Sequence, residues 1–179
     1  MRGADVRVRL AEWAQVFRYP GADYAAAVQQ LARPADGAEV PVARLVESFA
    51  AAISSLELEE VQQLYTATFD LNPSCPPFLG VYLFPQDLQR RTILMLRLHE
   101  KAQALGCAGA PEDADHLASV LELAGRLSSE DFAELAGCCL VPALEKMAQA
   151  LASSGNPYRF LLLALAEFCR VPEQLVVEV

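Results

Sequence analysis

The sequence lacks most of the short motifs that mark an enzyme. It has no Gly-Lys pair, so a Walker phosphate loop is absent, and neither G-x-G-x-x-G nor G-x-S-x-G occurs. There are only two histidines and five cysteines, and no two cysteines have C-x-x-C spacing. These absences argue against the commonest nucleotide, hydrolase and zinc sites. The sequence offers no convincing site for a cofactor or a metal.

Positive charge is also scarce. Lysine and arginine together number 14 against 23 acidic residues, which gives a net charge of −9. Nucleic-acid binding needs a basic surface, so nucleic acid is excluded as a partner, and an anionic membrane surface is an equally poor match. A basic peptide or cationic protein segment fits this balance better. Acidity that serves solubility alone is the competing interpretation.

Long apolar runs are missing as well. No stretch approaches the roughly 18 consecutive apolar residues of a membrane span, and Asp5 and Glu12 interrupt the N-terminal region where a secretory signal would need an apolar segment. We therefore expect a cytoplasmic protein without direct membrane insertion. The odd number of cysteines argues against a disulfide framework and favours buried apolar roles for most of them. Cys75 differs because its proline-rich surroundings predict an accessible side chain.

Alanine and leucine dominate the 54% of residues that are hydrophobic, and few segments have the alternation of strands. Proline and glycine separate the predicted helices. In the first half of the chain the predicted helices are Val6–Phe17, Ala22–Ala32, Val42–Ser54 and Glu57–Phe69. The sequence predicts an all-α fold of eight to nine helices in a single globular bundle, with one domain spanning residues 1–179.

The second half continues in the same way. A long helix from about Gln86 is expected to end at Gly106 as its C′ residue. Its predicted inward stripe is Leu88, Met95, Leu98, Ala102 and Leu105. The helix that follows the acidic run "EDAD" is predicted to face inward through Leu117, Val120, Leu121 and Ala124.

Three further features complete the predicted helices. Ser128 or Ser129 is the expected cap of the next helix, and Pro142 predicts a kink or a fresh start within it. The apolar helix Tyr158–Arg170 is expected at the centre, and the tail "EQLVVEV" is predicted to be extended.

The stretch "FDLNPSCPPFLGVYLFPQD" (Phe69–Asp87) interrupts this pattern. It holds four of the eleven prolines, yet most of its other residues are apolar or aromatic. Proline disfavours regular helix and biases the preceding residue towards extended backbone. The sequence thus predicts a proline-rich loop in mid-chain whose apolar side chains pack in the core or meet a ligand.

Asp115 and His116 are the most suggestive polar pair. Both are predicted to sit in the first turn of a helix, where the helix dipole stabilises an anionic Asp115 and disfavours a protonated His116. The alternative interpretation is a helix start with incidental polar residues. No other grouping in the sequence resembles a catalytic constellation.

Two segments together resemble the nitrate reductase delta-subunit family, which belongs to the TorD-like chaperones of redox-enzyme maturation. The first, Leu64–Gly106, contains Phe-Asp-Leu, then Leu-Gly-x-x-Leu-Phe, an arginine-bearing helix and a glycine stop. The second, "DADHLASVLELAGRL", resembles the Asp-His-Leu motif of that family, and "NPYRFLLLAL" resembles its C-terminal pattern. The sequence departs from the pattern at Ala114, where the family often has proline, and at Pro85-Gln86.

The resemblance implies an all-α, non-catalytic, cytoplasmic chaperone. Such chaperones bind the N-terminal segment of a molybdoenzyme catalytic subunit, often a twin-arginine signal peptide or its remnant, and assist insertion of the molybdenum cofactor before export or membrane docking. Asp115 and His116 match the motif implicated in peptide binding, and the loop from Pro76 to Phe84 matches a region near that groove.

A signal-like peptide presents arginines followed by an apolar run, so its receptor needs carboxylates beside an apolar groove. The candidate peptide-binding residues are therefore Phe78, Gly80, Tyr82, Phe84, Glu112, Asp113, Asp115 and His116. For each aromatic residue, ordinary core filling is the competing interpretation.

Two other functions remain open from the sequence. The chain is alternatively a structural or accessory subunit retained in a mature oxidoreductase, or a small nucleotide-binding protein. A nitrate reductase is the default client, and clients that act on selenate, chlorate, dimethyl sulfide or hydrocarbons belong to the same wider group. Both a monomer and a domain-swapped dimer are compatible with the sequence.

Overall fold

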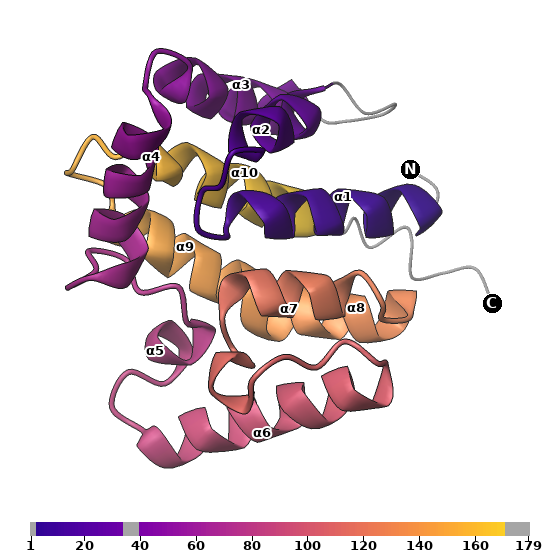
Figure 1. Cartoon of the computed structure of the whole chain (residues 1–179). Coiled ribbons are helices and arrows are strands. Elements are labelled where there is room, and N and C mark those ends of the chain that lie inside the picture. The colour runs from indigo at the N-terminus through magenta and orange to yellow at the C-terminus, as the bar shows by residue number, and fades with distance from the viewer. Residues whose placement is uncertain (1–2, 34–39, 171–179) are drawn as a thin grey trace.

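The computed structural model describes residues 3–33 and 40–170, and every described helix joins one α-helical assembly (Figure 1). The α-helices are α1 Gly3–Val16, α2 Tyr24–Ala32, α3 Val40–Ile53, α4 Leu58–Tyr65, α5 Leu79–Leu83, α6 Leu88–Ala104, α7 Leu117–Ala124, α8 Ser129–Leu135, α9 Val141–Ala150 and α10 Tyr158–Cys169. Because α8 and α9 form one continuous run, the described chain has nine helical runs and no strand. This confirms the predicted all-α bundle.

Two of the predicted helices contain a wider π-helical turn. The fourth helix continues past Tyr65 as the π-helix Thr66–Asp70, where the Thr68 hydroxyl donates to the Leu64 carbonyl at 2.6 Å. The π-helix Ala136–Leu140 joins α8 to α9 just before Pro142. Proline lacks the N–H that would continue a regular ladder, and the helical run widens into a π-helix just before Pro142 instead of ending and starting again.

The structure confirms two helix ends that the sequence predicted, the start of α8 and the end of α6. The Ser128 hydroxyl accepts the Asp131 N–H at 3.1 Å, so Ser128 is the cap of α8. Gly106 follows α6 with a φ of +66°, the left-handed conformation of a C′ glycine. These two helix ends were readable from sequence because each depends only on neighbouring residues.

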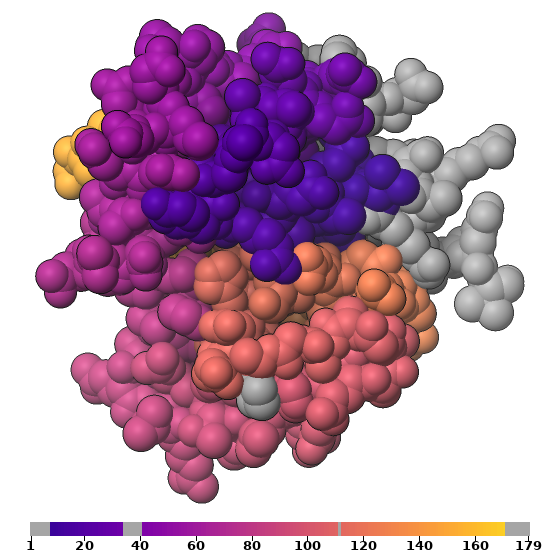
Figure 2. Space-filling model, in the orientation of Figure 1, coloured from indigo at the N-terminus to yellow at the C-terminus, as the bar shows by residue number. Residues whose placement is uncertain are grey.

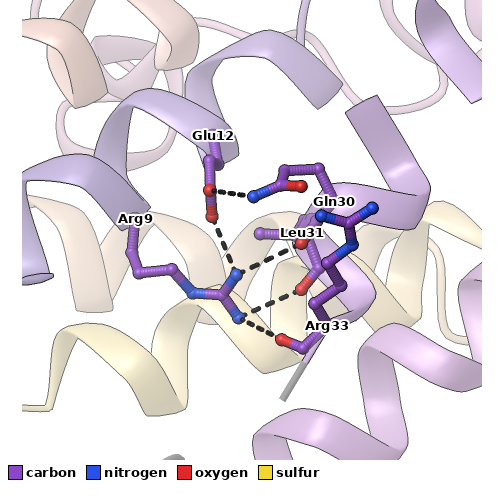
Figure 3. Close-up of polar contacts among 5 residues, drawn as sticks. All are labelled: Arg9, Glu12, Gln30, Leu31 and Arg33. Atoms are coloured by element: carbon purple, nitrogen blue, oxygen red, sulfur yellow. Dashed lines mark hydrogen bonds and ion pairs between the residues drawn. The ribbon is translucent and has the colours of Figure 1, made fainter. Parts of the chain in front are cut away.

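Arg9 of α1 closes the C-terminal end of α2 (Figure 3). Its guanidinium donates to the carbonyls of Gln30, Leu31 and Arg33 at 3.5, 3.0 and 3.3 Å. Glu12 pairs with Arg9 at 2.8 Å and accepts from Gln30 at 3.1 Å. A cation at the carbonyl end of a helix satisfies orphan acceptors and complements the dipole, so this cluster fastens α2 to α1.

α10 runs through the middle of the assembly, against α3 on one side and α9 on the other (Figure 1). Tyr158, at its N-terminal end, is fully buried and contacts the rings of Phe49 and Phe69, with centroid separations of 5.1 and 4.8 Å. The predicted central position of this helix is confirmed. The extended tail predicted after residue 170 lies outside the described residues.

The proline-rich stretch differs from its prediction in two ways. It contains a short helix, α5, where only loop was expected, and Cys75 is fully buried rather than accessible. The thiol of Cys75 lies 3.7 Å from the Met147 carbonyl of α9, which explains its burial. Despite its prolines, the loop therefore turns its first apolar side chains into the core.

The predicted stripe of α6 is partly wrong. Leu98 is buried and Ala102 and Leu105 pack against the core, but Leu88 is 73% exposed. α6 lies at the margin of the molecule, where it packs on α5, α7 and the 3₁₀ turn Pro111–Asp113 and its Lys101 pairs with Asp131 of α8 at 3.1 Å (Figure 1). Because so few elements cover it, a smaller part of its surface is buried than its sequence pattern suggests.

Candidate functional site

Asp115 fastens the proline-rich stretch to the segment that leads into α7. Its carboxylate accepts the Gly80 N–H at 2.9 Å, and its main-chain carbonyl accepts the Leu79 N–H, also at 2.9 Å. The Leu117 N–H in turn donates to the Pro77 carbonyl at 2.8 Å. Asp115 is only 1% exposed. In this conformation the carboxylate therefore binds the chain's own backbone and is not presented to solvent.

Glycine at position 80 is required by this contact. A Cβ atom there would lie 2.7 Å from the Asp115 carboxylate oxygen and 3.4 Å from the Arg91 Cγ atom. Side chains almost never approach that closely, so any larger residue would push the carboxylate away from the Gly80 N–H. The role of Gly80 is thus steric, at the junction of α5 and Asp115.

Burial raises the pKa of the Asp115 carboxyl above its ordinary value. The Gly80 N–H and the positive charge of Arg91 oppose this shift. The Nε atom of Arg91 is itself buried without a hydrogen-bond partner among the described residues. Asp115 and Arg91 are therefore electrostatically coupled, and each lowers the cost of burying the other.

His116 is the N-cap of α7 and not part of its first turn, so the predicted position of the pair is corrected. Its backbone is extended, and its Nδ1 atom accepts the Ala118 N–H at 3.2 Å. The imidazole packs edge-on against Phe78, with centroids 5.5 Å apart. His116 itself is held extended by its antiparallel bridge to Phe78, and α7 begins at the next residue, Leu117.

The pKa of His116 is lowered, chiefly by burial. The Asp113 carboxylate opposes this shift and the Arg18 guanidinium adds to it. A neutral imidazole also suits the cap, because Nδ1 must be unprotonated to accept a hydrogen bond. His116 is therefore a neutral acceptor near pH 7.

This shift predicts a loss of stability in acid. The unfolded chain binds a proton at His116 near the ordinary pKa of 6.5, whereas the folded chain binds it only at lower pH. The free energy of unfolding should therefore fall as pH drops through 6.5, by at most about 1.4 kcal/mol per pH unit. Urea denaturation between pH 7.5 and 5 measures this, and His116→Asn should flatten the slope. Equal slopes in wild type and His116→Asn would contradict the assignment.

Tyr82 and Phe84 lie on and after α5. The Tyr82 hydroxyl donates to the Cys75 sulfur at 3.4 Å, and its main-chain carbonyl accepts the Lys146 ammonium at 2.8 Å. Burial raises the pKa of the Cys75 thiol to about 11, so it is protonated at neutral pH and unsuited to nucleophilic attack. Tyr82 and Phe84 are each partly exposed, and Tyr82 also packs against the core.

A cavity of about 620 Å³ opens between the end of α1, the loop after α6 and α7. Its lining consists of Ala11, Arg18, Cys107, Ala108, Gly109, Ala110, Asp113, Ser119, Glu122, Gly125 and Arg126. A much smaller hollow of about 20 Å³ adjoins it and shares five of its lining residues, Cys107, Gly109, Ala110, Asp113 and Ser119. Most of the loop residues are small, so the backbone itself forms one wall.

Charges of both signs line this cavity. Arg18 pairs with Glu122 at 2.6 Å across 104 residues of sequence, and Arg126 donates to the Leu105 carbonyl at 3.4 Å. Asp113 forms no ion pair with any described residue. Its carboxylate is thus the acidic group in the lining that is open to an incoming cation.

The structure divides the predicted peptide-binding residues into two groups. Asp113 lines the cavity and Glu112 precedes it on the exposed 3₁₀ turn. The four α5-side residues, Phe78, Gly80, Tyr82 and Phe84, line neither the cavity nor its smaller neighbour, and His116 touches the first of them. His116 therefore lies between the acidic group and the aromatic group.

Sequence reasoning missed Arg18, Ser119, Glu122 and Arg126. Arg18 stands in "RYPG", which signalled only the end of a helix, and Glu122 is one polar position on an amphipathic helix. Nothing local indicates that they meet. Only the packing of α1 on α7 brings them together.

Resident metal chemistry finds no support in this geometry. Among residues 3–33 and 40–170, no three histidine, cysteine or acidic side chains cluster in a way that would hold a metal ion.

None of the described helices combines the length and the hydropathy needed to cross a membrane.

Comparison with known families decides the relationship. A family model described as nitrate reductase delta subunit matches residues 35–163, which is most of the chain. The chain belongs to the nitrate reductase delta subunit family. This family comprises accessory proteins that act as chaperones in molybdoenzyme assembly. No curated protein sequence matches the chain significantly.

The family match covers most of the candidate site but not all of it. The segments that carry α5, Asp115, His116 and most of the cavity lining lie within the matched range of the delta subunit family. Arg18 lies outside it. The resemblance first seen in Leu64–Gly106 and the Asp-His-Leu motif is thus confirmed at the level of the family.

Proposed function

We propose that this delta-subunit family member is a cytoplasmic chaperone for the catalytic subunit of a molybdoenzyme, with a nitrate reductase as the default client. It binds the N-terminal, twin-arginine-like segment of that subunit. It assists insertion of the molybdenum cofactor and assembly before export or membrane docking. The observation that carries the proposal is the cavity beside Asp113, in a chain of this family.

The cavity suits the basic part of such a segment. Its volume of about 620 Å³ falls in the range of roughly 300–1,000 Å³ typical of ligand sites. Asp113 offers a carboxylate without an ion pair among the described residues, and guanidinium–carboxylate pairs form strong, directional hydrogen bonds. An arginine of the client segment is therefore proposed to bind at Asp113.

The wall opposite α7 suits an extended backbone. The N–H groups of Ala108, Gly109 and Ala110 donate to no backbone carbonyl of the described chain. Their small side chains let a peptide approach closely enough to pair with them, as an added strand pairs with a sheet edge. The apolar part of the client segment is proposed to continue past His116 towards Phe78 and the partly exposed residues Tyr82 and Phe84.

Arg18 modulates this site. Its ion pair with Glu122 keeps the second carboxylate of the cavity occupied. A client arginine reaches Glu122 only by displacing Arg18, and that exposed pair contributes no more than about 1 kcal/mol. The exchange therefore costs little, and the cavity offers a cationic segment two acidic contacts.

Calorimetry with the N-terminal peptide of the catalytic subunit tests the proposal. Asp113→Asn should weaken binding about fivefold, because it removes one charge-assisted contact in a solvated cavity. Glu59→Gln, a charge-matched change on an exposed residue of α4, should have no effect. Replacing both peptide arginines by glutamine should weaken binding further, and Asp113→Asn should then make no difference.

Two results would contradict the proposal. One is binding no tighter than that of a scrambled peptide of equal charge. The other is recovery of the chain in fixed ratio with purified, active oxidoreductase, which would favour a retained subunit.

A further inference from the structure

Arg126 is a cation of the cavity lining that no carboxylate of the described chain neutralises. It is exposed, and it forms no ion pair with any residue that the structure describes. Its guanidinium donates to the Leu105 carbonyl at 3.4 Å, which is longer than most N–H···O hydrogen bonds. Because a guanidinium has several N–H donors, Arg126 keeps most of its donors for a ligand.

The packing of α1 on α7 leaves Arg126 without an acidic partner. Glu122 and Arg126 are four residues apart, a spacing that favours a glutamate–arginine pair along a helix. Glu122 instead pairs at 2.6 Å with Arg18, which follows α1. In the space-filling view, α1, α7 and the segment after α6 lie next to one another on one face of the molecule (Figure 2). The tertiary structure therefore gives Glu122 to Arg18 and leaves Arg126 for another group.

Asp113 carries the opposite charge near the other end of α7. α7 spans eight residues, which corresponds to roughly 12 Å of helix. Asp113 precedes the N-terminal end of α7 and Arg126 follows its C-terminal end, yet both line one cavity. Since Arg18 and Glu122 pair with each other, the lining offers a carboxylate near one end and a guanidinium near the other. A ligand that satisfies both carries a positive and a negative group.

We infer that Arg126 selects client segments with an acidic residue about four residues before the arginine that binds Asp113. The inference rests on the proposed function and names a further feature of the segment that this cavity accepts. The spacing follows because an extended chain advances about 3.3 Å per residue, so roughly 12 Å corresponds to about four residues.

The order of the two charged groups follows from the proposed path of the client segment. Its apolar part leaves past His116, at the N-terminal end of α7, whereas Arg126 stands at the C-terminal end. In a signal-like segment the arginines precede the apolar run. The part of the segment that reaches Arg126 therefore lies before the arginines.

The overall charge of the chain opposes this preference, which makes the preference diagnostic. With a net charge of −9, the chain should repel an added carboxylate on a peptide. A glutamate that strengthens binding therefore requires a cation close to it. A free anion would neutralise Arg126 but leave Asp113 without a partner, so one segment with both charges matches the lining better.

Fluorescence anisotropy with labelled synthetic peptides tests the inference on the full chain. Each peptide has two arginines followed by an apolar run, with glutamate or glutamine four residues before the first arginine. The glutamate peptide should bind the wild type about threefold tighter, as expected for one solvent-exposed ion pair. This advantage should vanish in Arg126→Gln and persist in Arg44→Gln, a change at an exposed arginine of α3 outside the cavity lining. Placing the glutamate directly before the arginines should also remove it.

Charge reversal tests whether the contact is direct. Arg126→Glu should bind a peptide with lysine at the glutamate position tighter than the glutamate peptide, which reverses the order of the wild type. Because Arg126 is exposed, the thermal midpoints of its variants should stay near that of the wild type.

Equal binding of the glutamate and glutamine peptides to the wild type would overturn the inference and leave the proposed function standing. The same holds for a glutamate advantage that survives in Arg126→Gln. Binding of both peptides no tighter than that of scrambled peptides would contradict the proposed function as well. Inorganic phosphate that raises the thermal midpoint of the wild type but not of Arg126→Gln would assign Arg126 to a free anion, which would also overturn the inference.

Discussion

Asp115→Ala is expected to lower the free energy of unfolding by about 3 kcal/mol, because it leaves the buried Gly80 N–H without its acceptor and the half-buried Arg91 without a nearby opposite charge. The Gly80 N–H loses its only carboxylate contact, at 2.9 Å, and the charge of Arg91 loses its opposing charge. For a chain of this size the thermal midpoint should fall by roughly 6–12 °C. Circular dichroism during thermal and urea unfolding measures the change.

Two other variants separate the causes. Asp115→Asn keeps an oxygen for the Gly80 N–H and loses only the charge, so a smaller loss of about 1 kcal/mol is expected. Asp113→Ala, two residues away on an exposed turn, should leave the unfolding free energy within about 0.5 kcal/mol of wild type. If Asp115→Ala kept full stability and lost only peptide binding, its carboxylate would act on the client and not on Gly80.

Tyr158→Ala is expected to lower the free energy of unfolding by about 4 kcal/mol, the usual range for removing a buried aromatic ring. Tyr158 is fully buried, where α10 meets α3, and its ring contacts Phe49 and Phe69. The cavity left behind would be lined by these rings, which cannot collapse onto one another without moving whole helices. The denaturant midpoint, with an unchanged m-value, measures the loss.

The hydroxyl of Tyr158 should matter much less than its ring. Tyr24 donates its proton to the Val16 carbonyl at 3.1 Å, so in the 2.9 Å contact between the two tyrosines Tyr158 is the donor. Tyr158→Phe removes that one hydrogen bond and should cost about 1 kcal/mol. Leu71→Ala, at a 70% exposed position, is the neutral control. A loss in Tyr158→Phe as large as in Tyr158→Ala would show that the hydroxyl network, not packing, dominates.

The helices themselves were predictable because their signals are local. The Ser128 cap, the C′ glycine at Gly106 and the irregular turn before Pro142 each depend on a few adjacent residues. The inward side of α7 followed from periodicity alone, and Leu117, Val120, Leu121 and Ala124 are all buried. Family membership was also readable, since it rests on the order of motifs along the chain.

The candidate site was predictable only in part. The acidic run, the Asp-His pair and the aromatic stretch were each visible in sequence. The sequence did not show that Asp115 is buried against the Gly80 N–H whereas Asp113 lines an open cavity. Asp115 and Asp113 are two residues apart and chemically identical, yet one is buried against Gly80 and the other lines the cavity. That distinction depends on which backbone N–H groups the tertiary fold places within reach.

By itself, the sequence determined an all-α chain, its main helix ends, its acidic balance and its family. Helix formation, capping and proline breaks are governed by interactions within a few residues, so they are written locally. The tertiary structure alone decided that Cys75 is buried, that Leu88 faces outward and that Arg18 meets Glu122 across 104 residues. Each of these depends on which elements pack against each other, and that follows from the joint burial of the whole core rather than from any one segment.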